Sequence, residues 1–374
     1  MRLSRSADHE LQLQWLPPTI YPNILTSLGI DGRWKLWVED DTAAPGRRFS
    51  SRGSSSGKAA FESKGPGRFP YRSFSVKHNE ESRHTYLAFL AADGYLSVME
   101  AEEPESLTEQ TKVDEFQALP KPDRGEETCF KVRFDPNPEP CYTALRAGMP
   151  LDSLSLVVAG LNSARIFRTR DTVAGSFGAA TRAREFYLAA DITGHKGLVR
   201  DVAWAPGNFR GYDIVATACQ DGFVRVFRVD TPFDKEDGRS WAVADVTGRQ
   251  QAHEEGHSNE KKTGHQQQQS TKSRSNSGQA HHHSGIRAEI DKSGAQTERT
   301  ATGQPGQIEH TIRELSKLDT HRSPVWRVGF DDDGQILGSV GDEGKLVCFR
   351  QKPDGTWAKS SELGTAGRTK MVVP

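Results

Sequence analysis

Hydrophobic and polar residues alternate in short runs along most of the chain, and five of these runs follow the same kind of turn. Each copy has a two-residue turn, usually Asp-Gly, then apolar residues at alternate positions and a large apolar residue. The copies begin at Asp31, Asp93, Leu161, Asp221 and Glu343. An Asp-Gly pair supplies the positive φ angles of a hairpin turn, and a period of two is typical of a pleated strand. The pattern therefore predicts five β-hairpins.

Further β-rich runs extend these hairpins. One such run precedes every turn. A further run precedes most of these runs, at 11–15, 130–134, 199–204 and 325–330. Candidate fourth strands lie at 71–76, 114–118, 184–189, 308–315 and 357–362. Three strands with a variable fourth, repeated along the chain, are the pattern of propeller blades. The predicted fold class is all-β, a WD40 β-propeller with five recognisable blades.

Two segments between the repeats differ in composition. Residues 43–67 are rich in Ser, Gly, Arg and Lys, and residues 249–306 contain a Gln run and a His run. Such segments bury too little apolar surface to offset the entropy lost on ordering, so both are predicted to be disordered surface loops. We expect one propeller over residues 1–374, with 364–374 as a tail.

Charge and cysteine content narrow the function classes. Lys and Arg number 49 against 50 Asp and Glu, which argues against a general nucleic-acid binder. No apolar stretch approaches the ~20 residues that a membrane helix needs, and the first residues lack the apolar core of a signal peptide. The four cysteines, Cys129, Cys141, Cys219 and Cys348, form no CxxC pair. We therefore expect a soluble intracellular protein without transmembrane segment, disulfides or direct nucleic-acid binding.

The candidate chemical motifs have simpler explanations. Gly53–Gly57 matches G-x-S-x-G, but the low-complexity flanks lack the strand and helix that a nucleophile elbow needs. The histidines between 253 and 283 lie in a predicted disordered loop, which fixes no metal geometry. The carboxylates of Glu126–Glu127 and Asp331–Asp333 do not converge as an acid/base pair, and the aspartates precede Gly334 as turn residues do. We expect no enzymatic activity, cofactor or metal.

A structural constellation recurs in three of the repeats. WD-repeat blades link their strands through a buried hydrogen-bond chain of His, Ser or Thr, Asp and Trp. The matching residues are Ser27, Asp31 and Trp37; His195, Thr217, Asp221 and Phe227; and His321, Ser339, Glu343 and Phe349. Both phenylalanines lack the indole N–H, and Ser6 stands at the histidine position of the first repeat. These chains are therefore predicted to be incomplete, so that packing carries more of the stability.

Longer segments carry a more specific likeness. They are Glu139–Arg146, Tyr187–Asp191, Leu198–Pro206, Ala216–Gly222 and Pro324–Val328. Together they resemble fungal Seh-type nucleoporins, the SEC-thirteen-like WD-repeat proteins, and the likeness is most specific over 184–229. The resemblance implies a six-bladed, open propeller into which an α-solenoid scaffold nucleoporin donates an extra blade. It also implies subunits of the Y-shaped complex of the nuclear pore and of a vacuolar membrane coat that regulates TORC signalling.

The resemblance further implies a scaffold role in transport of protein and mRNA, at the nuclear pore and at the vacuolar membrane. Physically, we expect a partner to satisfy unpaired strand edges of the open ring. Residues 11–15 match the family's second blade, so the N-terminal blade is expected to be truncated or lost. Two alternatives are an enzyme on a propeller and an adaptor of a vesicle coat or chromatin complex. The fold alone does not exclude an adaptor, but the likeness over 184–229 favours the nucleoporin.

Overall fold

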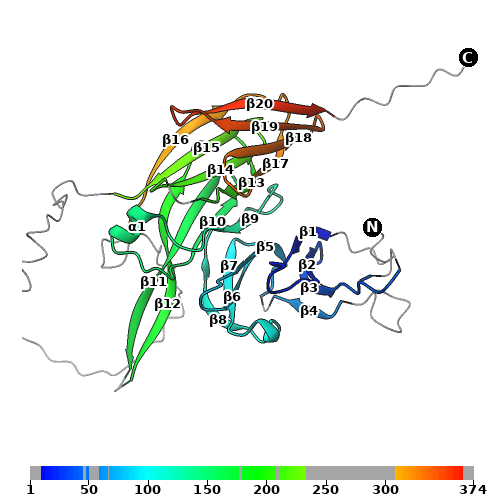
Figure 1. Ribbon diagram of the computed structural model, residues 1–374, viewed down its shortest axis with the longest axis vertical. Coiled ribbons are helices and arrows are strands. Elements are labelled where there is room, and N and C mark those ends of the chain that lie inside the picture. The colour runs from blue at the N-terminus through cyan, green and yellow to red at the C-terminus, as the bar shows by residue number, and fades with distance from the viewer. Residues whose placement is uncertain are drawn as a thin grey trace, which may run out of the picture. The chain divides into compact units, whose positions relative to one another are not determined.

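A computed structural model describes residues 10–44, 48–49, 59–65, 67–176, 179–207, 210–232 and 308–364 of the 374-residue chain. Within these ranges the chain forms five four-stranded antiparallel sheets, one after another in sequence (Figure 1). Each sheet keeps its strands in chain order, as a propeller blade does. The predicted all-β class and the five blades are confirmed.

The strand bounds follow the repeats. The first sheet holds β1 (Glu10–Trp15), β2 (Ile24–Gly29), β3 (Arg33–Val38) and β4 (Phe61–Lys64), and the second holds β5 (Tyr71–His78), β6 (Thr85–Ala91), β7 (Tyr95–Ala101) and β8 (Thr111–Gln117). The third holds β9 (Lys131–Phe134), β10 (Ser155–Gly160), β11 (Ser163–Ser176) and β12 (Ala179–Ile192). The fourth holds β13 (Val199–Trp204), β14 (Asp213–Cys219), β15 (Val224–Asp230) and β16 (Thr311–Leu318). The fifth holds β17 (Val325–Phe330), β18 (Ile336–Gly341), β19 (Lys345–Gln351) and β20 (Trp357–Gly364). A 3₁₀ turn, η1 (Pro104–Ser106), and one short helix, α1 (Tyr142–Arg146), complete the described elements.

The repeated turn requires glycine for a steric reason. Gly32 and Gly222 have φ angles of 76° and 84°, in the left-handed region. A Cβ at Gly32 would also lie 2.4 Å from the Cβ of Pro70. In the degenerate third copy Leu161 takes a φ of 53°, a conformation that costs an L-residue about 1–2 kcal/mol.

One strand prediction was wrong, and one strand lies where none was predicted. Residues 71–76 were expected to close the first sheet, but they lie in β5, the first strand of the second sheet. The fourth strand of the first sheet is β4, inside the segment 43–67 that was predicted to be disordered. Phe61 packs edge-on against the buried Trp34, 6.2 Å between ring centroids, and this contact offsets the cost of ordering a polar segment. Residues 249–306, the Gly53–Gly57 motif, Ser6 and 365–374 lie outside the described residues.

The hairpin of β11 and β12 is longer than predicted. The expected strand 184–189 extends to Ala179–Ile192 and pairs with β11 as far as Ser176. Figure 1 shows this two-stranded ribbon projecting beyond the other strands of the third sheet. No Pro interrupts residues 163–192, so the backbone pairing of the two strands continues past the sheet.

Hydrophobic clusters bind consecutive sheets together. Separate clusters join the first sheet to the second, the second to the third, the third to the fourth and the fourth to the fifth. In the described part of the chain, no such cluster joins the fifth sheet to the first. The propeller is therefore open within the described residues.

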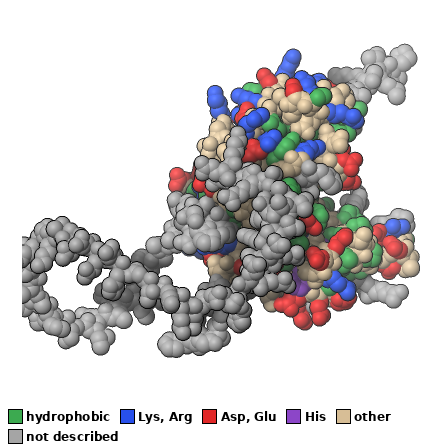
Figure 2. All heavy atoms as spheres, turned by 60° about the vertical axis from the view of Figure 1, so that its left-hand side comes forward, with side chains coloured by type: hydrophobic (Ala, Val, Ile, Leu, Met, Phe, Trp, Pro, Cys, Tyr) green, Lys and Arg blue, Asp and Glu red, His purple; other side chains and the backbone are tan. Residues whose placement is uncertain are grey.

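On the face seen in Figure 2, Lys and Arg side chains intersperse with Asp and Glu, consistent with the balanced composition.

Burial differs between the inner and the terminal sheets. The second strand of the fourth sheet, β14, is buried along its whole length because sheets cover both of its faces. In the fifth sheet, β18 alternates between buried and partly exposed residues. Leu337 packs toward the fourth sheet, whereas the other face carries Leu346 with 36% of its surface exposed. The fifth sheet thus leaves one face uncovered.

Candidate functional site

The predicted hydrogen-bond chain of the fourth sheet is present in part. The imidazole Nε2 of His195 lies 2.9 Å from the Thr217 hydroxyl on β14, and both side chains are buried. Asp221, in the turn after β14, bonds Arg225 instead, with 2.7 Å between Oδ2 and Nη2. Its other oxygen accepts the backbone N–H of Phe223. The Asp221 carboxylate was expected to continue the hydrogen-bond chain from His195, but it binds Arg225.

This rearrangement affects two protonation equilibria. Burial, and then the charge of Arg225, lowers the pKa of His195 to about 4, so the imidazole is neutral at pH 7. Burial alone would raise the pKa of Asp221. The hydrogen bonds from Arg225 and its other donors outweigh burial and lower that pKa to about 2. The cluster holds one fixed ion pair beside a neutral histidine.

The hydrogen-bond chain of the fifth sheet links more residues than that of the fourth sheet. His321 bridges two partners, with its Nδ1 2.6 Å from Glu343 Oε1 and its Nε2 2.6 Å from the Ser339 hydroxyl. Ser323 also donates to Glu343. Burial would raise the pKa of Glu343, but hydrogen bonds from Ser323 and His321 outweigh it and lower the pKa. Here a glutamate reaches the imidazole that the shorter Asp221 does not reach in the fourth sheet.

In the first sheet, the tryptophan of the predicted hydrogen-bond chain is present and bonded. Trp37 donates its indole N–H to the Ser27 hydroxyl at 2.8 Å, and both side chains are buried. Asp31 accepts the backbone N–H of Arg33 and pairs with its guanidinium at 3.2 Å. In the other two sheets, Phe227 and Phe349 occupy the tryptophan position as buried packing residues. The structure therefore links only part of each predicted set: His195 with Thr217, Trp37 with Ser27, and His321 with Ser339 and Glu343.

Sequence reasoning missed the hydrogen bonds that connect neighbouring sheets. Gln12 on β1 donates to the carbonyl of Phe74 at 2.7 Å, and the hydroxyl of Ser75 accepts the backbone N–H of Phe134. Asp201 on β13 accepts the N–H of Val328 on β17 at 3.3 Å. All three polar side chains are buried. Their signal in the sequence was a polar residue inside the first strand of a repeat, at a position where alternation alone predicts only an exposed face.

A fully buried ion pair also joins the third and fourth sheets. Arg168 on β11 donates to Asp213 at the start of β14, 2.6 Å between Nη2 and Oδ2, and neither side chain is more than 1% exposed. Arg168 also donates to Ser155, and its guanidinium lies 5.7 Å from the Trp204 ring centroid. The pairing was invisible in the sequence because the two residues are on different repeats. It is part of the structural framework.

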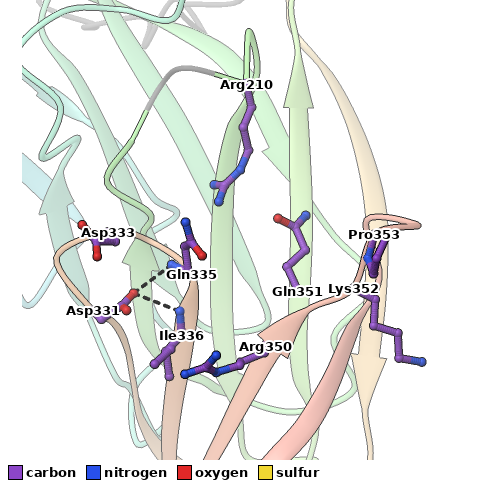
Figure 3. A pocket seen from close by; sticks show the side chains of 9 residues that line it. All are labelled: Arg210, Asp331, Asp333, Gln335, Ile336, Arg350, Gln351, Lys352 and Pro353. Carbon is purple, nitrogen blue, oxygen red and sulfur yellow. Dashed lines mark hydrogen bonds between the residues drawn. The ribbon is translucent and has the colours of Figure 1, made fainter.

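A polar cavity of about 510 Å³ lies at the loop end of the fifth sheet (Figure 3). Arg210, Arg350 and Lys352 line it together with Asp331 and Asp333. Asp331 accepts the backbone N–H groups of the two residues that follow Gly334 in this turn, at 2.8 and 2.9 Å. This capping is the turn role expected for the aspartate cluster.

The described residues contain no cluster that could bind a metal ion. No group of three or more His, Cys, Asp or Glu side chains among them is placed to hold a metal ion. All four cysteines are free, and none of the described helices is long and apolar enough to cross a membrane. The geometry supports linkage between strands and sheets, and it leaves the uncovered face of the fifth sheet as the main candidate contact surface.

Comparison with known proteins agrees with this geometry. The family model "WD domain, G-beta repeat" matches residues 187–228, almost the stretch in which the sequence likeness was most specific. The chain is 44% identical to nucleoporin SEH1 of Chaetomium thermophilum, over 98% of this chain and 86% of that protein. It is 26% identical to nucleoporin SEH1 of Saccharomyces cerevisiae, over 90% of this chain and 78% of that protein. A nucleoporin seh1 of Schizosaccharomyces pombe is 26% identical over 71% of this chain and 55% of its own length.

Proposed function

The chain belongs to the SEH1 family of nucleoporins, and from this premise we propose that it is a non-enzymatic structural subunit of the nuclear pore complex. Its role is to hold a partner on the open end of the propeller. One observation carries the proposal. The last sheet presents an uncovered apolar face, although every sheet in the described chain already has its four strands.

The exposed face follows from the alternation of the strands. Val347 and Phe349 on β19 point toward the fourth sheet and are completely buried. Leu346 directly precedes Val347 and Cys348 directly follows it, so both belong to the opposite face of the strand. On β20, Leu363 pairs with Leu346 and is 63% exposed. This face is a sheet surface with nothing packed on it in the described structure.

Sheet packing explains why a partner is needed. When two sheets pack face to face, they remove apolar surface from water. Each Å² removed stabilises the contact by about 25 cal/mol. The inner sheets of this chain have neighbours on both faces, and their second strands are buried throughout. A blade-like sheet from another chain would give the fifth sheet the same environment. The structure therefore favours packing on a face over the strand-edge pairing expected from the sequence.

The partner is an α-solenoid scaffold nucleoporin that donates a blade to the open propeller, and the assembly is the Y-shaped complex of the nuclear pore. The same chain serves in a vacuolar membrane coat that regulates TORC signalling. Its contribution to transport of protein and mRNA is architectural. The open end of the propeller and the membership of the family support these steps.

The experiment compares two substitutions on the fifth sheet. Tagged full-length wild-type protein, Leu346→Glu and the control Lys352→Glu are expressed in a fungal host and isolated with bound proteins for quantitative mass spectrometry. Lys352 lies in the turn after β19, at the opposite end of that strand from Leu346. Because a charge buried in an apolar interface is costly, Leu346→Glu should lower recovery of the α-solenoid nucleoporin at least about tenfold. The control should retain it.

Two results would overturn the proposal. Recovery of vesicle-coat or chromatin subunits alone by the wild type would contradict the nuclear pore assignment. Equal recovery of the α-solenoid nucleoporin by all three proteins would show that the exposed face does not hold it. Circular dichroism of each variant confirms that the sheets are intact before the comparison.

A further inference from the structure

Basic side chains from the third and fifth sheets gather at the inner strands of the propeller. The first strands of the third, fourth and fifth sheets, β9, β13 and β17, lie next to one another. Lys131 and Arg133 come from β9 and Arg327 comes from β17. Asp201 on β13 lies between the two arginines, 3.8 Å from a guanidinium nitrogen of each.

The positive charge in this cluster is not balanced. The Asp201 carboxylate is shared by both guanidinium groups at a distance beyond hydrogen bonding, and it also accepts the N–H of Val328. Lys131 is only 8% exposed, and its ammonium forms no hydrogen bond or ion pair with the rest of the described chain. Nearby, Arg200 is already paired with Glu127 at 2.9 Å.

The unpartnered ammonium is the unusual feature. Buried charges in proteins are normally paired, because an unpaired ion loses its hydration without a replacement. Burial, and then the charge of Arg327, lowers the pKa of Lys131, and the nearby Asp201 carboxylate opposes this shift only in part. Lys131 has three donors, and each arginine presents a planar fork of donors. An anion placed among them would satisfy all three side chains.

We propose that Lys131, Arg133 and Arg327 form a binding site for a small anion that carries phosphate groups. Phosphate oxygens match the donor geometry of two guanidinium groups and one ammonium. The site lies on strands of a packed sheet array, so its donors are held in place before binding. Because Lys131 is deeply buried, the site favours a compact inorganic polyphosphate over a bulky polymer.

The polar cavity at the end of the fifth sheet is a weaker competitor for the same ligand. It also has three basic side chains, but two carboxylates face them, against one in the inner cluster. Asp331 is engaged in capping the turn and would repel an anion. The two locations can be separated by single substitutions, Lys131→Met in the inner cluster and Lys352→Gln in the cavity.

The test uses the full-length chain with inorganic pyrophosphate and tripolyphosphate at constant ionic strength. Isothermal titration gives the affinity, and thermal unfolding gives the shift in Tm at saturating anion. The wild type should bind saturably, with tripolyphosphate tighter than pyrophosphate. Lys131→Met should weaken binding at least about tenfold, and Lys352→Gln should leave it unchanged.

Two further measurements keep the proposal falsifiable. Without anion, Lys131→Met should be at least as stable as the wild type, because it removes an unpaired buried charge. If that variant does not fold, Arg327→Gln replaces it, since the Arg327 side chain is 50% exposed and its removal leaves the core intact. Absence of saturable binding by the wild type up to about 10 mM would overturn the proposal. Equal weakening by Lys131→Met and Lys352→Gln would overturn it as well.

Discussion

Substitution of Asp213 by Asn tests the buried ion pair that joins the third and fourth sheets. Arg168 and Asp213 are 2.6 Å apart and almost completely excluded from water. The substitution keeps the shape of the side chain but removes its charge, which leaves the Arg168 guanidinium buried without its counterion. Breaking a buried pair in this way costs about 3–5 kcal/mol. We expect a loss near the lower end, because the nearby Asp135 carboxylate also interacts with Arg168.

The measurement is urea unfolding followed by tryptophan fluorescence. The Trp204 ring lies close to Arg168 and reports on the interface itself. The control is Glu39→Gln, which breaks the exposed pair between Glu39 and Arg48, 3.1 Å apart, and should cost at most about 1 kcal/mol. Replacing both buried partners, as in Arg168→Met with Asp213→Leu, should recover most of the loss.

A clear result would refute this reasoning. If Asp213→Asn lost no more free energy of unfolding than the Glu39→Gln control, the buried pair would contribute as little as a surface pair. If the double variant were less stable than Asp213→Asn alone, the cost would come from altered packing and not from an uncompensated charge.

The hydrogen bonds between strands and the glycine turns lead to three other predictions. Trp37→Phe should lower the free energy of unfolding by about 1–3 kcal/mol, because the buried Ser27 hydroxyl loses its donor; Trp37→Phe with Ser27→Ala should recover part of the loss in the same urea assay. His195 titrates with a pKa lowered to about 4, below its ordinary value of 6.5, so the unfolded chain binds more protons between these values. Stability should therefore fall as the pH drops from 6.5 to 4, and the urea midpoint of His195→Gln should fall less. Gly32→Ala should reduce Tm much more than Gly355→Ala: both glycines have positive φ, but a Cβ at Gly32 meets a proline and a Cβ at Gly355 meets nothing within 4 Å.

Each of these has a contradicting outcome. Equal losses for Trp37→Phe and the double variant would mean that the hydroxyl is not the source of the cost. Parallel pH profiles for wild type and His195→Gln would exclude the histidine as the titrating group. Similar melting temperatures for the two glycine variants would show that backbone strain, common to both, decides the loss.

The sequence by itself determined the strands and hairpins of the propeller. Asp-Gly turns such as Asp221-Gly222 and the alternation after them are local signals, since they depend on residues adjacent in the chain. The five blades and the membership in a WD-repeat family followed from repeating this signal. The assignment of residues 71–76 to a sheet failed, because a strand does not specify in its own sequence which neighbour it pairs with.

The tertiary structure alone decided which side chains meet. The sequence spacing placed His195 and Asp221 in one hydrogen-bond chain, but in the fold the Asp221 carboxylate binds Arg225. Lys131 and Arg327 stand far apart in the sequence, and only the packing of inner strands from different sheets gathers them around one carboxylate. The uncovered face of the fifth sheet has the same origin. Local alternation predicts that a strand has two faces, whereas the number of neighbouring sheets determines which of them is buried.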